Sequence, residues 1–100
     1  MGNRNKIENL LFSTVKEINT QLPKEKQLTK SSNTVLFGNN GKLDSLGLVN
    51  FLVMVEQNIE DEFDISLTIA DDRAMSQKHS PFRTISTLAN YINMILNEKL

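Results

Sequence analysis

The chain has 100 residues, a net charge of −1 and no cysteine. This length allows a single domain, residues 1–100, with one modest hydrophobic core. The lack of cysteine excludes disulfides and thiolate metal sites, and the single histidine, His79, would have to supply any Ser-His-Asp triad or zinc site alone.

An amphipathic helix is predicted from Asn5 to Leu22, because apolar residues recur there at steps of three or four. Pro23 favours an end to this helix, since the residue before a proline avoids the helical region. Residues 23–43 then form a connection so long that a functional role is expected for it. Four apolar residues should attach this connection to the core: Leu28, Val35, Leu36 and Phe37.

A second helix is predicted to begin at Asp44-Ser45, because both residue types are favoured N-caps. The stretch from Leu46 to Phe63 keeps helical spacing and is the most hydrophobic part of the chain, so it should pack against several elements. Residues 65–69 alternate with a period of two. This pattern indicates a short extended segment rather than a sheet, since no second strand is available to pair with it.

A short third helix is predicted over residues 70–78, and Ser80-Pro81-Phe82 then interrupts the chain. Thr84 is expected to cap a final helix whose apolar residues again recur at helical spacing. The predicted fold class is therefore all-α, a four-helix bundle with three main helices, a short third helix and a long first loop.

The charges are unevenly divided along the chain. Residues 43–72 carry eight acids and no base, whereas residues 1–42 carry seven bases and three acids. Such an acidic face is either simply solvated or able to steer a basic partner. No basic stripe interleaved with aromatic residues suggests nucleic-acid binding. No apolar run approaches the roughly 20 residues that cross a bilayer, and the opening residues lack an apolar signal core. We therefore expect a cytoplasmic monomer without a membrane span.

The stretch Gly41–Val49, with Asp44-Ser45-Leu46 at its centre, is the most informative motif. In isolation this tripeptide would be interpreted as a plain helix cap. Here it follows a long loop and opens the most apolar helix, and the chain closes with the stretch Phe82–Ile92. In these features, which cover nearly the whole chain, the sequence resembles the acyl carrier protein family.

The resemblance implies a right-handed bundle of the acyl-carrier-protein type that carries a 4'-phosphopantetheine arm on Ser45. A phosphopantetheinyl transferase would take the arm from coenzyme A, and its thiol would hold acyl or aminoacyl cargo as a thioester. The other implied partners are an acyl- or aminoacyl-activating ligase and acyltransferases or synthases. A helix start favours a phosphate through its free amides and dipole. The carrier would not be an enzyme, and no catalytic residue and no metal ligand are expected.

The resemblance also assigns residues around Ser45. Asp44 would cap the helix and help to orient the serine or a metal in the partner's site. Leu46 would both contact partners or cargo at the attachment site and pack against the core. Val49 is expected in the core. The predicted partner face follows the second helix at Gly47, Asn50, Phe51, Glu56 and Glu60.

Two alternatives to a general fatty-acid carrier remain open. Gly47 and Asn50 are neutral where fatty-acid carriers often have acids, which favours a dedicated carrier that serves a specialised pathway over one for general fatty acid biosynthesis in lipid metabolism. The other alternative is an unmodified helical adaptor that docks partners through the acidic second helix. An enzyme is the third and most distant interpretation.

Overall fold

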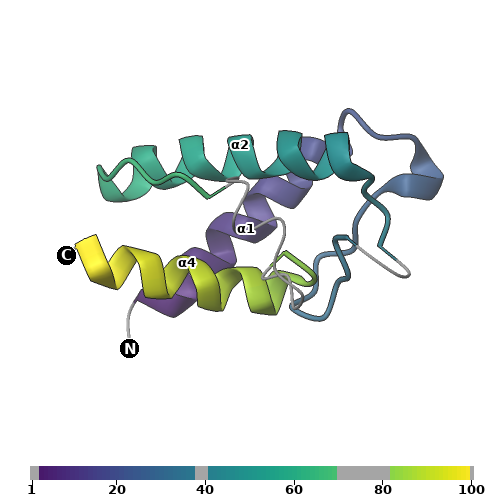
Figure 1. Cartoon of the computed structure of the whole chain (residues 1–100). Coiled ribbons are helices and arrows are strands. Elements are labelled where there is room, and N and C mark those ends of the chain that lie inside the picture. The colour runs from purple at the N-terminus through teal and green to yellow at the C-terminus, as the bar shows by residue number, and fades with distance from the viewer. Residues whose placement is uncertain (1–2, 38–40, 70–81, 100) are drawn as a thin grey trace.

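The computed structural model describes residues 3–37, 41–69 and 82–99. This part of the chain contains three long helices, α1 (Asn3–Asn19), α2 (Ser45–Phe63) and α4 (Ile85–Lys99), and a single 3-10 turn, η1 (Lys24–Lys26). Helix α1 packs against both α2 and α4 (Figure 1). The prediction of a small all-helical bundle is confirmed for these residues. The third helix predicted over 70–78 and the Ser80-Pro81 break lie outside them.

The core forms where the apolar stripes of the three helices meet. Each stripe follows the steps of three and four that bring residues to one face of a helix. The buried residues of α2 are Leu48, Phe51, Leu52, Val55 and Ile59. They meet Ile7, Leu11, Val15 and Ile18 of α1 and Ile85, Leu88, Ile92 and Leu96 of α4. None of the described helices is long and apolar enough to cross a membrane.

Helix α1 ends at Asn19, three residues before the end predicted from its apolar spacing. The chain leaves the helix through a turn in which the N–H of Gln21 donates to the carbonyl of Ile18 at 2.9 Å. The Asn19 side chain then pairs with the backbone of Leu28, donating to its carbonyl at 2.9 Å and accepting from its N–H at 2.8 Å. This two-bond clamp turns the connection back along α1, so the helix stops before Pro23.

Three of the four residues predicted to attach the long connection to the core do so: Leu28, Leu36 and Phe37. Leu28 and Leu36 are buried, and Val35 and Phe37 are half-buried. The backbone of the connection also pairs with the segment that leads into α4. The N–H of Leu36 donates to the carbonyl of Arg83 at 2.7 Å, and Val35 forms an isolated antiparallel bridge with Thr84. The loop before α2 is therefore held against the start of α4.

Helix α4 begins with a reciprocal cap at Thr84, which confirms the predicted N-cap. The N–H of Thr87 donates to Thr84 Oγ1 at 3.1 Å, and the N–H of Thr84 donates to Thr87 Oγ1 at 3.0 Å. This arrangement satisfies two backbone donors with two hydroxyls, as a capping box does.

Side chains in the segment after α2 are alternately buried and exposed. Asp64 ends the helix in the left-handed region (φ 56°), and its N–H donates to the carbonyl of Glu60. Leu67 and Ile69 are buried, whereas Ser66 and Thr68 are exposed. The predicted period of two is confirmed, and no strand is present among the described residues.

A polar contact joins α1 to α2 within the bundle. The Asn58 amide of α2 donates to Thr14 Oγ1 at 2.8 Å and to Glu17 Oε1 at 2.9 Å. Thr14 is fully buried, and its hydroxyl donates in turn to the carbonyl of Leu10. Because a buried hydroxyl needs hydrogen-bond partners, this series of hydrogen bonds constrains how α1 and α2 pack together.

We expect Asn58→Ala to lower the free energy of unfolding by about 1 kcal/mol, the net value of a typical intramolecular hydrogen bond. Urea unfolding followed by circular dichroism measures the change. Gln57→Ala is the matched control, because Gln57 is exposed on the same turn of α2. Equal midpoints for the two variants would show that the Asn58 contacts add nothing to stability.

Candidate functional site

The start of α2 has the geometry predicted for the motif. Asp44 lies in an extended conformation (φ −84°, ψ −176°), and its Oδ1 accepts from the N–H of Gly47 at 2.7 Å. Its carbonyl accepts from the N–H of Leu48 at 2.8 Å. Asp44 is thus the N-cap, and Ser45 is the first residue of the helix. The side chain of Ser45 lies outside the described part of the structure.

The backbone before the cap is fixed by the first loop. Leu43 is buried, and its N–H donates to the carbonyl of Leu36 at 3.1 Å. Leu36 is itself bonded to Arg83 at the start of α4. The position of the cap is therefore determined by two segments that are distant in the sequence.

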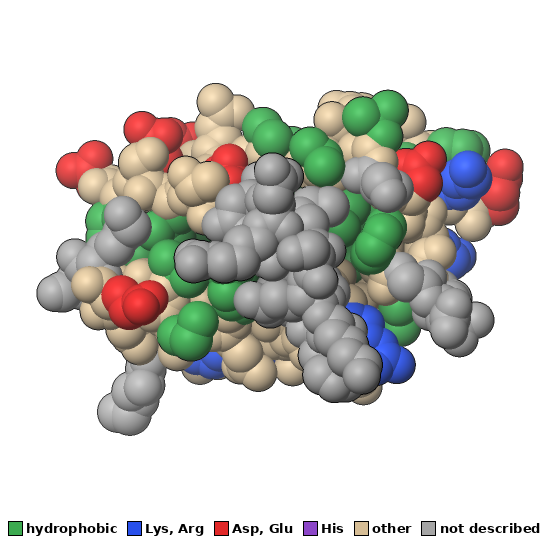
Figure 2. Space-filling view, in the orientation of Figure 1, with side chains coloured by type: hydrophobic (Ala, Val, Ile, Leu, Met, Phe, Trp, Pro, Cys, Tyr) green, Lys and Arg blue, Asp and Glu red, His purple; other side chains and the backbone are tan. Residues whose placement is uncertain are grey.

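The residues on either side of Ser45 face solvent. Asp44 is exposed, and the Leu46 side chain keeps 70% of its surface exposed. Leu46 therefore contributes little to packing, whereas Val49 is half-buried rather than fully in the core. Figure 2 shows hydrophobic side chains over the first part of α2 and acidic ones near its end. The start of α2 therefore presents an apolar side chain to solvent.

Four of the five residues predicted for the partner face keep some access to solvent. Asn50 and Glu60 are exposed, and Gly47 and Glu56 are half-buried. The Glu56 carboxylate accepts from the N–H of Ile69, so it also holds the segment after α2.

Phe51 requires a correction. The resemblance to acyl carrier proteins places it on the partner face, but its side chain is fully buried in the core. Phe51 lies six positions beyond Ser45, which at about 100° per residue places the two residues on different faces of the helix. The exposed apolar positions on α2 are instead Leu46 and Val53, which is 49% exposed.

Gly47 has a packing role in the cap. A Cβ atom at this position would lie 3.1 Å from Asp44 Oδ1 and 3.4 Å from Cδ2 of Leu43. The absence of a side chain therefore leaves room for the capping carboxylate. This explains a glycine in the first turn without assigning it to a partner.

Removing the cap is expected to destabilise the start of α2. We expect Asp44→Ala to lower the free energy of unfolding by about 1 kcal/mol, the usual cost of losing an N-cap side chain. Urea unfolding gives the change, with Asp61→Ala as the control because Asp61 is an exposed acid inside the same helix. An Asp44→Ala midpoint equal to that of the control would contradict a capping role.

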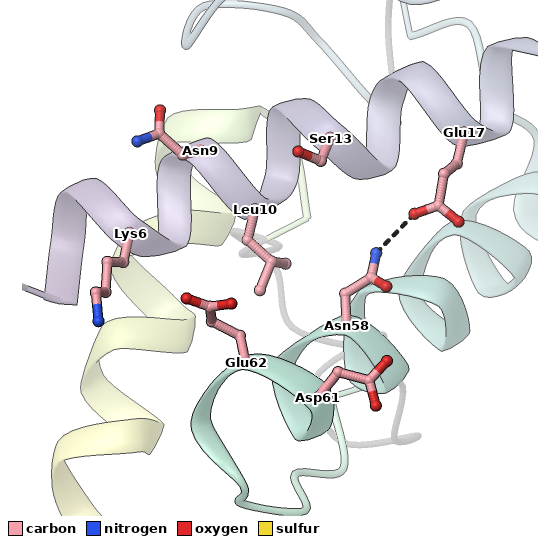
Figure 3. A pocket seen from close by; sticks show the side chains of 8 residues that line it. All are labelled: Lys6, Asn9, Leu10, Ser13, Glu17, Asn58, Asp61 and Glu62. Carbon is pink, nitrogen blue, oxygen red and sulfur yellow. Dashed lines mark hydrogen bonds between the residues drawn. The ribbon is translucent and has the colours of Figure 1, made fainter.

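A groove between α1 and α2 lies far from this site. Its volume is about 430 Å³, and Figure 3 shows Lys6 and Glu62 at one end and the Glu17–Asn58 hydrogen bond at the other. Asn58 is 13 residues beyond Ser45, about 20 Å along the helix. No sequence pattern predicts this groove, because it depends on how two helices pack. Its remaining lining residues are Asn9, Leu10, Ser13 and Asp61.

Neither the start of α2 nor the groove between α1 and α2 contains a cluster of metal-ligating side chains among the described residues. Within the described ranges, no group of three His, Asp or Glu side chains could hold a metal ion. His79 lies outside these ranges. Comparison with protein-family models, curated proteins and solved structures finds no match. The resemblance to acyl carrier proteins therefore rests on the residues of this chain.

Proposed function

We propose that the protein is a carrier that holds acyl or aminoacyl intermediates as thioesters on a 4'-phosphopantetheine arm attached to Ser45. The observation that carries the proposal is the start of α2 at Ser45, with Asp44 as its N-cap. This is where the attachment motif of the family requires a helix to begin.

The surroundings of Ser45 suit a charged attachment. The first turn of a helix presents backbone N–H groups and the positive end of the helix dipole, both of which favour a phosphodiester. Exposed neighbours on both sides, Asp44 and Leu46, leave the helix start accessible to a modifying enzyme. The loop contacts of Leu43 keep this site at a fixed place on the bundle.

The attachment reaction balances as a transfer from coenzyme A. The Ser45 hydroxyl oxygen forms a bond to the phosphorus next to pantetheine, and the bond from that phosphorus to the bridging pyrophosphate oxygen breaks. Adenosine 3',5'-bisphosphate leaves, and the serine proton passes to a base of the transferase. The arm then supplies the thiol that carries the cargo. The chain's own part is to present the serine and to be recognised.

Recognition would use the exposed side of α2. Leu46 and Val53 offer apolar contacts seven residues apart, two turns along the same side of the helix. The exposed acids Glu60, Asp61 and Glu62 follow at its end. A transferase, a ligase, or an acyltransferase or synthase with an apolar contact flanked by Lys or Arg would match this surface.

Incubation with coenzyme A and a broad-specificity phosphopantetheinyl transferase tests the proposal. Intact-mass spectrometry should show the mass gain of one arm on the folded protein and none on Ser45→Ala. Ser66→Ala is the matched control, because Ser66 is an exposed serine elsewhere on the chain. No gain on the wild-type protein, or a gain that survives Ser45→Ala, would contradict attachment at this serine.

An unmodified adaptor is the second candidate, and the exposed apolar residues Leu46 and Val53 favour it. A monomeric domain that only binds partners needs the same surface but no arm. In that case intact-mass spectrometry shows no added mass on the wild-type protein. The double variant Leu46→Ala/Val53→Ala nevertheless loses the ability to bind a partner. The two candidates are thus separated by the modification rather than by binding.

A further inference from the structure

A second groove lies on a neighbouring face of α1, between that helix and the connection that follows it. Its volume is about 500 Å³, within the roughly 300–1,000 Å³ typical of small-molecule sites. The residues that line it are Asn9, Phe12, Ser13, Val15, Lys16, Asn19, Leu28 and Lys30. We call it the α1–loop groove. It shares only Asn9 and Ser13 with the groove of Figure 3.

The outer wall of the α1–loop groove is held in place by hydrogen bonds. The clamp from the Asn19 side chain to both backbone groups of Leu28 fixes the connection against the end of α1. The Gln27 amide adds a bond to the carbonyl of Asn19 at 3.1 Å. The groove is therefore formed before any ligand arrives, which lowers the ordering cost of binding.

The floor and the rim of this groove differ in chemistry. Val15 and Leu28 are buried with 2% and 5% of their surface exposed, and Phe12 is half-buried beside them. Two exposed lysines, Lys16 and Lys30, stand at the rim. No acid is among the described residues that line the groove, in contrast to the three acids of the α1–α2 groove.

The side chain of Lys30 is held at the groove by a contact with the Phe12 ring. Its Nζ lies 5.7 Å from the centroid of the Phe12 ring, within the range of a cation–π contact. This contact places an ammonium group over the apolar floor. A ligand that contacts the Phe12 side chain would therefore also meet the positive charge over its ring.

From this juxtaposition we propose that the α1–loop groove binds a small amphipathic carboxylate. The apolar body lies on Phe12, Val15 and Leu28, and the carboxylate is bound by Lys16 and Lys30. The site is independent of any arm on Ser45, because neither α2 nor the residues of the attachment motif line it.

Titration of the full chain with octanoate, followed by ¹H–¹⁵N NMR, tests the proposal. We expect saturable shifts of the amides around Phe12 and from Leu28 to Lys30, with a dissociation constant of about 1 mM or below, in the range of weak ligands. Octanol should bind about tenfold more weakly, since it lacks the charge. Acetate, which lacks the apolar body, should produce no saturable shift.

The variant Lys16→Gln/Lys30→Gln should weaken octanoate binding about tenfold and leave octanol binding unchanged. The matched control is Lys24→Gln/Lys26→Gln, which removes the same charge from exposed lysines outside the groove. Phe12→Ala should weaken both ligands. Dispersed spectra check that each variant is folded.

Three results would overturn the site. They are shifts that do not saturate, shifts centred on α2 or α4, and an equal loss of octanoate affinity in the two lysine variants. Binding of an acidic protein segment in the groove, with no octanoate binding, would likewise replace the small-molecule site by a docking surface.

Discussion

Replacing Phe51 with alanine is expected to destabilise the protein by about 3–5 kcal/mol, the cost of removing a large aromatic side chain from a core. The Phe51 ring is fully buried in the cluster formed by the three helices. Since small domains have a total stability of about 5–15 kcal/mol, this single change would remove a large share of it. Urea unfolding by circular dichroism measures the loss.

Two further variants keep this prediction testable if Phe51→Ala fails to fold. Phe51→Leu leaves most of the volume filled and should cost less than half as much. Asn50→Ala changes the exposed neighbour and should shift stability by less than about 0.5 kcal/mol. If Phe51→Ala cost no more than Asn50→Ala, the ring would not be part of the core, and its predicted partner role would return.

Gly41→Ala is expected to cost about 2 kcal/mol, because the new methyl group has no room. A Cβ at Gly41 would lie 2.7 Å from Cα and from the carbonyl carbon of Phe37 and 2.8 Å from its nitrogen. These are backbone atoms, so the loop itself must move, and overpacking of this kind costs about 1–3 kcal/mol. The loss should appear as a lower unfolding midpoint and as shifted amides at Leu43 and Asp44.

Gly47→Ala is the matched control for Gly41→Ala. Its Cβ would lie 3.1 Å from Oδ1 of the exposed Asp44 and 3.4 Å from Cδ2 of Leu43, both side-chain atoms that can shift by a few tenths of an ångström. The higher helix propensity of alanine, up to about 1 kcal/mol, offsets this pressure. We therefore expect little net change for Gly47→Ala. A larger loss at Gly47 than at Gly41 would contradict the assignment of the close approach to Phe37.

The sequence predicted α2 well but not which of its apolar residues face out. Apolar side chains surround much of this helix, so spacing alone does not decide which stripe is buried. The structure buries Phe51 and leaves Leu46 and Val53 exposed. That outcome depends on where α1 and the long loop lie, which is tertiary information.

For a similar reason, local sequence patterns predicted neither the end of α1 nor the structural contact of Glu56. Apolar spacing continues to Leu22, but the bonds between Asn19 and Leu28 turn the chain earlier. Glu56 was assigned to partners by resemblance, and its carboxylate also accepts from Ile69, 13 residues further on. Local patterns do not predict contacts between polar groups that meet only after folding.

The start of α2 is the part of the molecule that the sequence predicts best. The cap at Asp44 and the helix start at Ser45 follow from short-range hydrogen bonding, which a few neighbouring residues determine. The two grooves depend on how α1 packs against α2 and against the connection that follows α1, and no local sequence pattern predicts them. Attachment of an arm at Ser45 stays a prediction until the mass experiment is done.

The bridge between Val35 and Thr84 has a consequence for how the protein folds. It joins residues about 50 positions apart, so all of α2 lies inside a closed ring of chain. Closing such a ring costs entropy that grows with the logarithm of its length, and contacts of this range slow folding. The N–H of Ile85 donates to the carbonyl of Thr34 beside this bridge. We therefore expect the Leu36 and Ile85 amides to gain protection from hydrogen exchange together during refolding, later than amides inside α1.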